Sequence, residues 1–216
     1  MNLASRIDHT LLRADATPTE VERLCAEAAE WGFAGVCVNS AHIERVAARL
    51  AGTGVLPIAV AGFPLGAASP AAKAFEAGWA VRNGAREIDV VIAVGLLKAG
   101  DRAGVLADLR EVVEASRPWP VKAILETCLL GREEKILACA IAEEAGARFV
   151  KTSTGFGAGG ATVEDVALLR RVVGDRMGVK ASGGIRTAAD AQRMIEAGAD
   201  RLGASASVSI VKGDAR

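Results

Sequence analysis

Two lysines stand inside short apolar segments whose pattern predicts buried strands. Lys151 precedes a glycine-rich loop, and Lys180 precedes Ser182-Gly183-Gly184. Burial of an ammonium group removes its hydration and favours the neutral amine, which is the form that attacks a carbonyl carbon. A second ammonium close by acts in the same direction, because like charges repel. We therefore interpret Lys151 as a candidate nucleophile, with Lys180 as its neighbour.

Acidic residues on earlier segments could complete a set of groups for proton transfer. Asp89 lies in the run Glu-Ile-Asp-Val-Val-Ile. Lys122 and Glu126 share one parity on the next segment, so they could face the same side. A lone lysine of this kind is commonly part of an internal ion pair or reaches solvent. Asp89 beside Lys151 and Lys180 would have a catalytic role beyond an ion pair, because a carboxylate there can carry protons to and from a substrate.

Two consecutive turns near the end of the chain are rich in glycine and serine. They read Ser182-Gly183-Gly184-Ile185-Arg186 and Gly203-Ala204-Ser205-Ala206-Ser207, and each precedes a predicted helix. Glycine leaves backbone N–H groups accessible, and the start of a helix attracts an anion. Each turn alone is also explained as a tight loop without a ligand, but the pair favours a phosphate site.

Eight short apolar segments alternate with helical patterns along the chain. The predicted strands are Ile7–Leu11, Gly35–Val38, Leu56–Gly62, Glu87–Val91, Val121–Leu125, Arg148–Lys151, Val179–Ala181 and Arg201–Gly203. The helical patterns that follow them cover 18–31, 41–51, 70–83, 102–115, 134–144, 163–173, 188–197 and 207–211. Strands that are buried on both faces of a parallel sheet read as continuous apolar runs, as these do.

This alternation predicts an α/β fold, a single (β/α)8 TIM barrel in which residues 1–216 form one domain. An open doubly wound sheet is the alternative, and it has less support because no G-x-G-x-x-G motif follows the first predicted strand. In a barrel, the C-terminal ends of all eight strands meet at one face. Asp89, Lys151 and Lys180 would then point into one site, and both glycine-rich turns would border it.

The composition is that of an ordinary globular protein, with 51% hydrophobic and 24% charged residues. Its 26 basic and 26 acidic residues cancel, which speaks against a nucleic-acid partner. No apolar run approaches the roughly 18 residues of a membrane helix, and the first residues do not resemble a signal peptide. We therefore expect no membrane association and a cytoplasmic location. Two histidines, and four cysteines without C-x-x-C spacing, predict neither a metal site nor a disulfide framework.

Seven motifs are distributed along the chain from Ile7 to about Val211. They are Ile7-Asp8-His9-Thr10-Leu11-Leu12, Val36-Cys37-Val38-Asn39, Gly62-Phe63-Pro64-Leu65-Gly66, Glu87-Ile88-Asp89, Glu126-Thr127-Cys128, Phe149–Phe156 and Val179–Arg186. In this order they closely resemble the bacterial 2-deoxyribose-5-phosphate aldolase family. The resemblance implies a class I aldolase that cleaves 2-deoxyribose 5-phosphate reversibly to acetaldehyde and glyceraldehyde 3-phosphate through a lysine Schiff base. It also implies a place in deoxyribose phosphate catabolism.

The resemblance implies roles for individual residues as well. Lys151 would form the Schiff base, Asp89 would donate and accept protons, and Lys180 would assist. The implied phosphate-binding positions are Gly183, Gly184, Gly203 and Ser205. The implied pocket-lining groups are Asp8, Thr10, Cys37 and Thr154. Neither a metal nor an organic cofactor is implied, and the family usually forms homodimers or homotetramers.

The chain departs from many bacterial relatives near the implied site. Ala93 stands in place of an asparagine, Ala206 stands in place of a second serine, and the tail that ends at Arg216 contains no tyrosine. Two other functions stay open. One is a Schiff-base aldolase with a keto-acid or dihydroxyacetone-type donor, and the other is a catalytically weak protein that binds a sugar phosphate.

Overall fold

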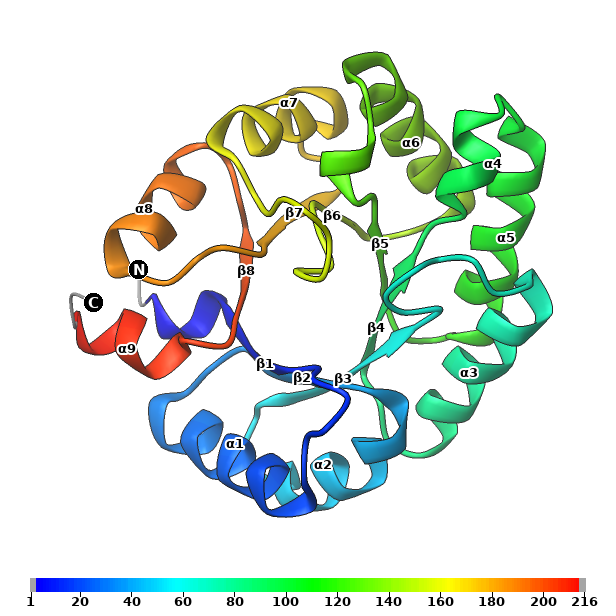
Figure 1. The fold of residues 1–216 in the computed structure, drawn as a ribbon. Helices are drawn as coiled ribbons and strands as arrows, with labels where there is room; N and C mark the ends of the chain where they lie inside the picture. The colour runs from blue at the N-terminus through cyan, green and yellow to red at the C-terminus, as the bar shows by residue number, and fades with distance from the viewer. Residues whose placement is uncertain (1–2, 214–216) are drawn as a thin grey trace.

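Eight parallel strands close into a barrel in the computed structural model, which describes residues 3–213 (Figure 1). Each strand pairs with the next along the chain, and the eighth pairs with the first. The strands are β1 (Ile7–Leu11), β2 (Gly35–Val38), β3 (Leu56–Ala61), β4 (Glu87–Val91), β5 (Val121–Ile124), β6 (Phe149–Lys151), β7 (Gly178–Ser182) and β8 (Arg201–Ala204). The prediction of a (β/α)8 TIM barrel is confirmed. Residues 1–2 and 214–216 of the domain predicted over 1–216 lie outside the described residues.

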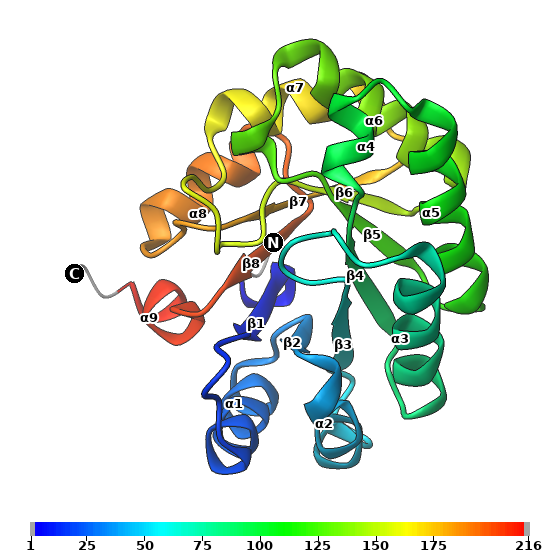
Figure 2. The same ribbon diagram turned by 45° about the vertical axis from the view of Figure 1, so that its right-hand side comes forward.

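A ring of helices surrounds the barrel, because each strand is followed by a helix that leads the chain back to the start of the next strand (Figure 1, Figure 2). The helices are α1 (Pro18–Trp31), α2 (Ile43–Leu50), α3 (Pro70–Arg82), α4 (Val94–Lys98), α5 (Arg102–Ala115), α6 (Arg132–Ala145), α7 (Val163–Val173), α8 (Ala188–Glu196) and α9 (Ser207–Lys212). Short 3-10 turns are η1 (Ala4–Arg6), η2 (Ser40–His42) and η3 (Thr127–Leu129). Among residues 3–213, no helix combines the length and the hydrophobicity that crossing a membrane requires.

The bounds of α1 follow from its terminal residues. The side chain of Thr17 accepts a hydrogen bond from the backbone N–H of Glu20, and the carboxylate of Glu20 accepts one from the backbone of Thr17. Two free N–H groups at the helix start are thereby satisfied. Pro18 occupies the first turn, where its missing N–H costs nothing, and Gly32 ends the helix with a left-handed φ of 64°. The predicted helix over 18–31 is confirmed at both ends.

Side chains on each strand alternate between the surrounding helices and the inside of the barrel. Outward-facing residues, such as Val36 and Val38 of β2, join one large apolar core between the barrel and its helices. Part of the interior is also apolar, as a small cluster of Leu12, Cys37, Ile58 and Val60. Several other interior positions carry charged side chains from β1 and from β4 to β8. They are Asp8, Glu87, Asp89, Lys122, Lys151, Lys180 and Arg201.

The main difference from the predicted elements is α4, which the sequence pattern did not indicate. The residues from Val90 to Leu97 form one apolar run, and this run holds the end of β4, a short turn and most of α4. Within a short, continuously apolar run, periodicity does not separate a strand from a helix. The other boundaries differ from the predicted ones by a few residues, which is ordinary for the ends of elements.

Candidate active site

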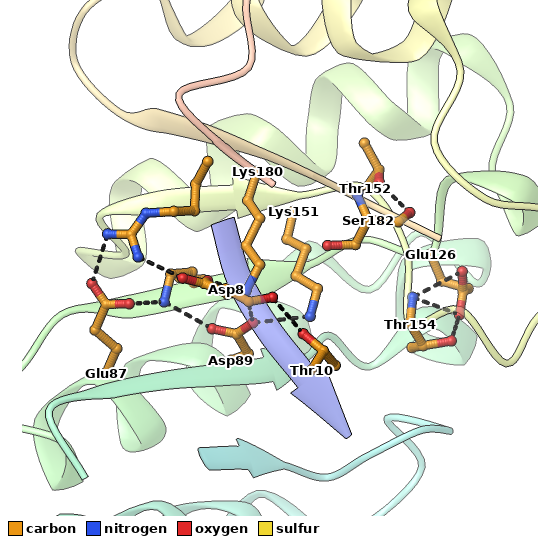
Figure 3. Close-up of polar contacts among 12 residues, drawn as sticks. Asp8, Thr10, Glu87, Asp89, Glu126, Lys151, Thr152, Thr154, Lys180 and Ser182 are labelled. Carbon is orange, nitrogen blue, oxygen red and sulfur yellow. Dashed lines mark hydrogen bonds and ion pairs between the residues drawn. The ribbon is translucent and has the colours of Figure 1, made fainter. Parts of the chain in front are cut away.

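Asp89 joins the two lysines that the sequence singled out. In Figure 3, Lys151 from β6 and Lys180 from β7 extend toward the carboxylate of Asp89 from β4. The Nζ atom of Lys151 lies 2.9 Å from Oδ2 of Asp89, and Nζ of Lys180 lies 2.8 Å from the same oxygen. All three side chains are buried. The barrel therefore brings together three charged groups that lie far apart in the chain.

Further charged residues extend this contact across the barrel. Lys122 lies 3.0 Å from Oδ1 of Asp89 and also contacts Glu87. Arg201 lies 3.4 Å from Glu87 and 2.6 Å from Asp8. The resulting charged network consists of Asp8, Glu87, Asp89, Lys122, Lys151, Lys180 and Arg201. Its four cations face three carboxylates, so it carries one more positive than negative charge when every member is ionised.

Glu87 and Arg201 are not among the site residues predicted from the sequence. Parity is the signal that could have found them, because residues two positions apart on a strand face the same side. Glu87 precedes Asp89 by two positions, and Arg201 precedes Gly203 by two positions. Both residues also begin their strands, where a charged side chain is equally well explained by exposure to solvent.

The network determines the ionisation of its buried members. Burial raises the pKa of Asp89, but its three lysine neighbours outweigh that effect and hold the pKa well below the usual value. Burial lowers the pKa of Lys180, but the carboxylates of Asp8 and Asp89 outweigh it and raise the pKa. Both groups therefore stay ionised at neutral pH. Asp89 is able to accept a proton, and Lys180 supplies a lasting positive charge.

A cavity of about 460 Å³ opens at the C-terminal ends of the strands. The residues of the sequence prediction that line it are Thr10, Lys151, Thr154, Gly183, Gly184, Gly203 and Ser205. Ser182 and Phe156 also border the cavity, and Arg13 and Arg186 add positive charge to its lining. Among the described members of the charged network, Lys151 alone reaches the cavity. A carbonyl compound bound there would therefore meet its amine.

Close packing explains why glycine occupies position 203. A Cβ atom on Gly203 would lie 2.3 Å from Oγ of Ser182 and 3.1 Å from Cε of Lys180. The turn after β7 has a different reason for glycine, because Gly183 and Gly184 adopt φ values of 88° and 79°, a region that other residues rarely enter. The glycines that the sequence assigned to phosphate binding thus have structural roles as well.

Thr154 is held by a buried carboxylate from the neighbouring strand-to-helix turn. Its hydroxyl donates to Oε2 of Glu126, and its backbone N–H lies 3.3 Å from the same oxygen (Figure 3). Glu126 has a left-handed φ of 55°, which is uncommon for a residue with a side chain. Strand parity does not relate Glu126 to Lys122, since β5 ends at Ile124 and the backbone turns at Glu126.

Two residues predicted to line the pocket lie beneath it. Asp8 is fully buried within the charged network, and Cys37 is fully buried in the small apolar cluster inside the barrel. Burial raises the pKa of the Cys37 thiol to about 11, so the thiol is protonated at neutral pH. Thr10 does reach the cavity, and its hydroxyl donates to the carbonyl oxygen of Asp8 at 2.9 Å.

Within residues 3–213, no three His, Cys, Asp or Glu side chains are grouped as metal ligands would be.

Sequence relatives of this chain are aldolases. A protein from Carboxydothermus hydrogenoformans named deoxyribose-phosphate aldolase is 57% identical over 215 residues, which cover 98% of this chain and 94% of that protein. A protein of the same name from Thermoanaerobacter is 55% identical, with 98% and 96% covered. In both cases the match extends over nearly the full length of the two chains.

Solved structures agree with the sequence relatives. The structure of deoxyribose phosphate aldolase from Aeropyrum pernix, described as tetrameric, superposes with a TM-score of 0.92 at 36% identity and covers 97% of this chain and 89% of that one. The family model described as DeoC/LacD family aldolase matches residues 3–212. The chain therefore belongs to the DeoC/LacD aldolase family.

Proposed function

We propose that this protein is a class I deoxyribose-phosphate aldolase, which cleaves 2-deoxy-D-ribose 5-phosphate reversibly to acetaldehyde and D-glyceraldehyde 3-phosphate. The observation that carries the proposal is the position of Lys151, whose amine contacts Asp89 and borders the cavity. The barrel alone would not support it, because this fold hosts many chemistries. The relatives named deoxyribose-phosphate aldolase supply the substrate.

The proposed reaction begins with the neutral amine of Lys151. Its Nζ atom attacks C1 of the open-chain sugar to give a carbinolamine. The carbinolamine hydroxyl takes up the proton that the ammonium form had released and leaves as water, so that an iminium ion remains. Because four cations face three carboxylates in the charged network, the loss of one proton leaves its charges balanced. Lys151 supplies the attacking amine, because it is the member of the network whose side chain lines the cavity.

Carbon–carbon cleavage then uses the ionised carboxylate of Asp89. Through a water molecule, Asp89 accepts the proton of the C3 hydroxyl. The C2–C3 bond breaks, C3 becomes the aldehyde carbon of glyceraldehyde 3-phosphate, and the electron pair of the bond moves into the iminium to form an enamine on Lys151. The proton that Asp89 took up returns through the water molecule to C2 of the enamine. Addition of a second water molecule to the resulting iminium releases acetaldehyde and restores the amine. Lys180 keeps its charge throughout and holds Asp89 in place.

The phosphate of the substrate is assigned to the turns after β7 and β8. Gly183 and Gly184 present backbone N–H groups, and Ser205 presents a hydroxyl, at the border of the cavity. Arg186 in the same lining adds positive charge. Ala206 lacks the hydroxyl that many relatives carry at this position, and the missing hydrogen bond would lower phosphate affinity by about 1 kcal/mol.

Other features of the proposed enzyme follow from its chemistry and its relatives. The reaction uses no metal or organic cofactor, because the iminium on Lys151 is the electron sink. We assign it to deoxyribose phosphate catabolism in the cytoplasm, with a homodimer or homotetramer as the working form. The tetrameric structure of the Aeropyrum pernix protein supports assembly. Light scattering during size-exclusion chromatography would measure the mass of the assembly.

Trapping of the Schiff base tests the proposal. Incubation with 2-deoxyribose 5-phosphate and sodium borohydride should convert the imine to a stable secondary amine, which mass spectrometry would locate on the peptide that contains Lys151. Lys151→Arg should abolish both labelling and acetaldehyde release. Lys135→Arg is the matched control, because Lys135 pairs with Asp165 outside the cavity at 2.6 Å. Labelling of another lysine together with full turnover by Lys151→Arg would refute the assignment.

A further inference from the structure

A hydrogen-bonded cluster lies on the outer side of β1, which Figure 1 shows between α1 and α9. The ring of His9 is buried there, with 3% of the residue exposed. Its Nδ1 atom lies 2.9 Å from Oγ of Ser207, and its Nε2 atom lies 2.8 Å from Oε2 of Glu27. Ser207 donates its own hydroxyl proton to the carbonyl oxygen of Ala204 at 2.9 Å. The cluster thus ties α1 and β1 to the start of α9.

This cluster touches the turn that carries the proposed phosphate site. Residues 203–205 line the cavity, and Ser207 follows as the first residue of α9. Ala204 is paired with His9 in the ladder between β1 and β8. Ala206, at the N-cap position, forms no side-chain cap. The hydroxyl of Ser207 therefore holds the carbonyl of this turn, and the ring of His9 faces the same carbonyl.

A serine, a histidine and a carboxylate in a row are also found in hydrolases. Burial argues against that function here. Ser207 is fully buried, and neither Ser207 nor His9 belongs to the lining of the active-site cavity, so a substrate carbonyl does not reach the serine oxygen. The hydroxyl proton of Ser207 is already used by Ala204. The cluster acts on the protein itself.

The number of protons on the His9 ring decides how many hydrogen bonds of the cluster can form at the same time. When Ser207 donates to Ala204, Nδ1 of His9 must carry a proton to bond Oγ of Ser207. A bond from Nε2 to the carboxylate of Glu27 requires a second proton on the same ring. The imidazolium form therefore makes all the contacts, whereas the neutral ring leaves one unmade or turns the hydroxyl away from Ala204. Burial lowers the pKa of His9 despite Glu27, so the neutral form prevails at pH 7.

We propose that His9 is a positioning residue for the phosphate-binding turn 203–207, which it holds through Ser207 while Glu27 anchors the imidazole to α1. The inference rests on the proposed function, because it takes the phosphate of the substrate to bind at this turn. Its effect falls on binding of the phosphorylated end of the substrate. The amine chemistry of Lys151 is separate, since the imidazole makes its contacts on the opposite face of β1 from the charged network.

Two substrates that differ only in the phosphate separate positioning from general damage. His9→Leu and Ser207→Ala should each raise KM for 2-deoxyribose 5-phosphate about fivefold, the ratio that one lost hydrogen bond corresponds to. Their kcat for this substrate, and both constants for unphosphorylated 2-deoxyribose, should stay unchanged. His9→Asn, which retains a polar group near the position of Nδ1, should restore most of the affinity. Equal increases of KM for both substrates, or a lower Tm with unchanged KM, would overturn the proposal.

Inorganic phosphate provides a readout that does not depend on turnover. Titration calorimetry should find weaker phosphate binding in His9→Leu and Ser207→Ala than in the wild type. His42→Asn is the matched control, because the chain contains only two histidines and His42 lies at η2, away from the turn. Unchanged binding in the first two variants would overturn the proposal. A wild type that binds phosphate but cleaves neither sugar would count against the proposed function and not against the role of His9.

The pH dependence tests the role of the imidazole proton. The charged groups that face His9 are Glu27 and Arg23 of α1. The groups that face it from β8 and α9 are uncharged, namely the Ala204 carbonyl and the Ser207 hydroxyl. The ratio of phosphate affinities between wild type and His9→Leu cancels the titration of the ligand. This ratio should grow as pH falls through the pKa of His9. NMR of the His42→Asn variant measures that pKa, because its one remaining imidazole signal comes from His9. A ratio that does not change with pH would overturn this role.

Discussion

Asp89 is the residue on which the charged network converges, because its two carboxylate oxygens face three ammonium groups. Lys122 and Lys180 each have a second carboxylate, in Glu87 and Asp8 respectively. Lys151 contacts Asp89 alone among the described carboxylates, within ion-pair distance. A buried charge that loses its only partner is costly, whereas one with a second partner is less affected.

Asp89→Asn should therefore destabilise the protein by about 3–5 kcal/mol, chiefly through the unpaired ammonium of Lys151. The double variant Asp89→Asn/Lys151→Met should recover much of this loss, because it removes both charges. Urea unfolding of the four members of this mutant cycle measures the coupling. Glu114→Gln serves as control, since Glu114 and its partner Arg117 lie 2.8 Å apart on the surface and loss of this pair should cost about 1 kcal/mol or less. Additive effects of the two buried substitutions would contradict the assigned pairing.

Gly203 shows how a single missing side chain leaves room for the site. Gly203→Ala should lower stability by about 1–3 kcal/mol, because its Cβ atom would lie 2.3 Å from Oγ of Ser182. Adding Ser182→Ala should relieve most of the cost, which thermal unfolding would record. Gly184→Ala meets open space and has only its φ of 79° to strain it, so Ser182→Ala should not rescue it. Rescue of both variants, or of neither, would argue against the steric explanation.

Elements of the barrel are joined by a second buried ion pair, between α3 and α5. Nζ of Lys73 lies 2.7 Å from Oδ2 of Asp108 and donates to the carbonyl oxygen of Val91 at 3.0 Å. Both side chains are almost completely buried. Val91 ends β4, the strand that carries Asp89. The pair therefore links two outer helices to the strand that positions the proposed base.

Lys73→Met should destabilise the fold by about 3–5 kcal/mol, because the carboxylate of Asp108 would be left buried without its cation. Lys73→Met/Asp108→Asn removes both charges and should be closer to the wild type in stability. Denaturant unfolding followed by circular dichroism measures the difference. Lys98→Met is a suitable comparison, since its partner Glu134 lies 3.2 Å away on the surface and the change should be small. A double variant as unstable as Lys73→Met would show that another contact is responsible.

For the whole molecule, the buried charges determine how stability varies with pH. Asp8 and Asp89 have a lower pKa in the folded protein than the ordinary 3.8, so the unfolded chain binds protons first as pH falls. Their contribution is present above about pH 4 and is lost below it. Lys180 has a raised pKa, so its contribution is present below the ordinary 10.5 and is lost as pH rises beyond that value.

His9 makes a third contribution to the dependence of stability on pH. Its pKa lies below the ordinary 6.5, so the unfolded chain takes up the proton first and stability begins to fall below about pH 6.5. We expect the free energy of unfolding in urea to be greatest between about pH 6.5 and pH 10.5. His9→Asn should flatten the decrease between pH 6.5 and pH 4 and leave the steeper decrease below it. Constant stability down to pH 3 would contradict the ionisation assigned to Asp8 and Asp89.

Much of the barrel could be predicted because its signals are local. Apolar runs of strand length, helical periodicity and residues such as Thr17 and Gly32 depend only on near neighbours in the chain. The helix α4 was missed for the same reason, since Val90 to Leu97 carries no polar residue to mark its turn. Lys151, Lys180 and Asp89 were found because a charge inside an apolar segment stands out without knowledge of its partners.

By itself, then, the sequence determined the alternation of elements, the family and the residue types that could perform the chemistry. Only the tertiary structure decided that Arg201 and Glu87 join the charged network, that Cys37 lies beneath the cavity, and that Ser207 meets His9. These contacts depend on the register of a closed barrel, which places side chains from opposite ends of the chain at the same height. Local patterns do not contain that register, because it results from the closure of eight strands at once.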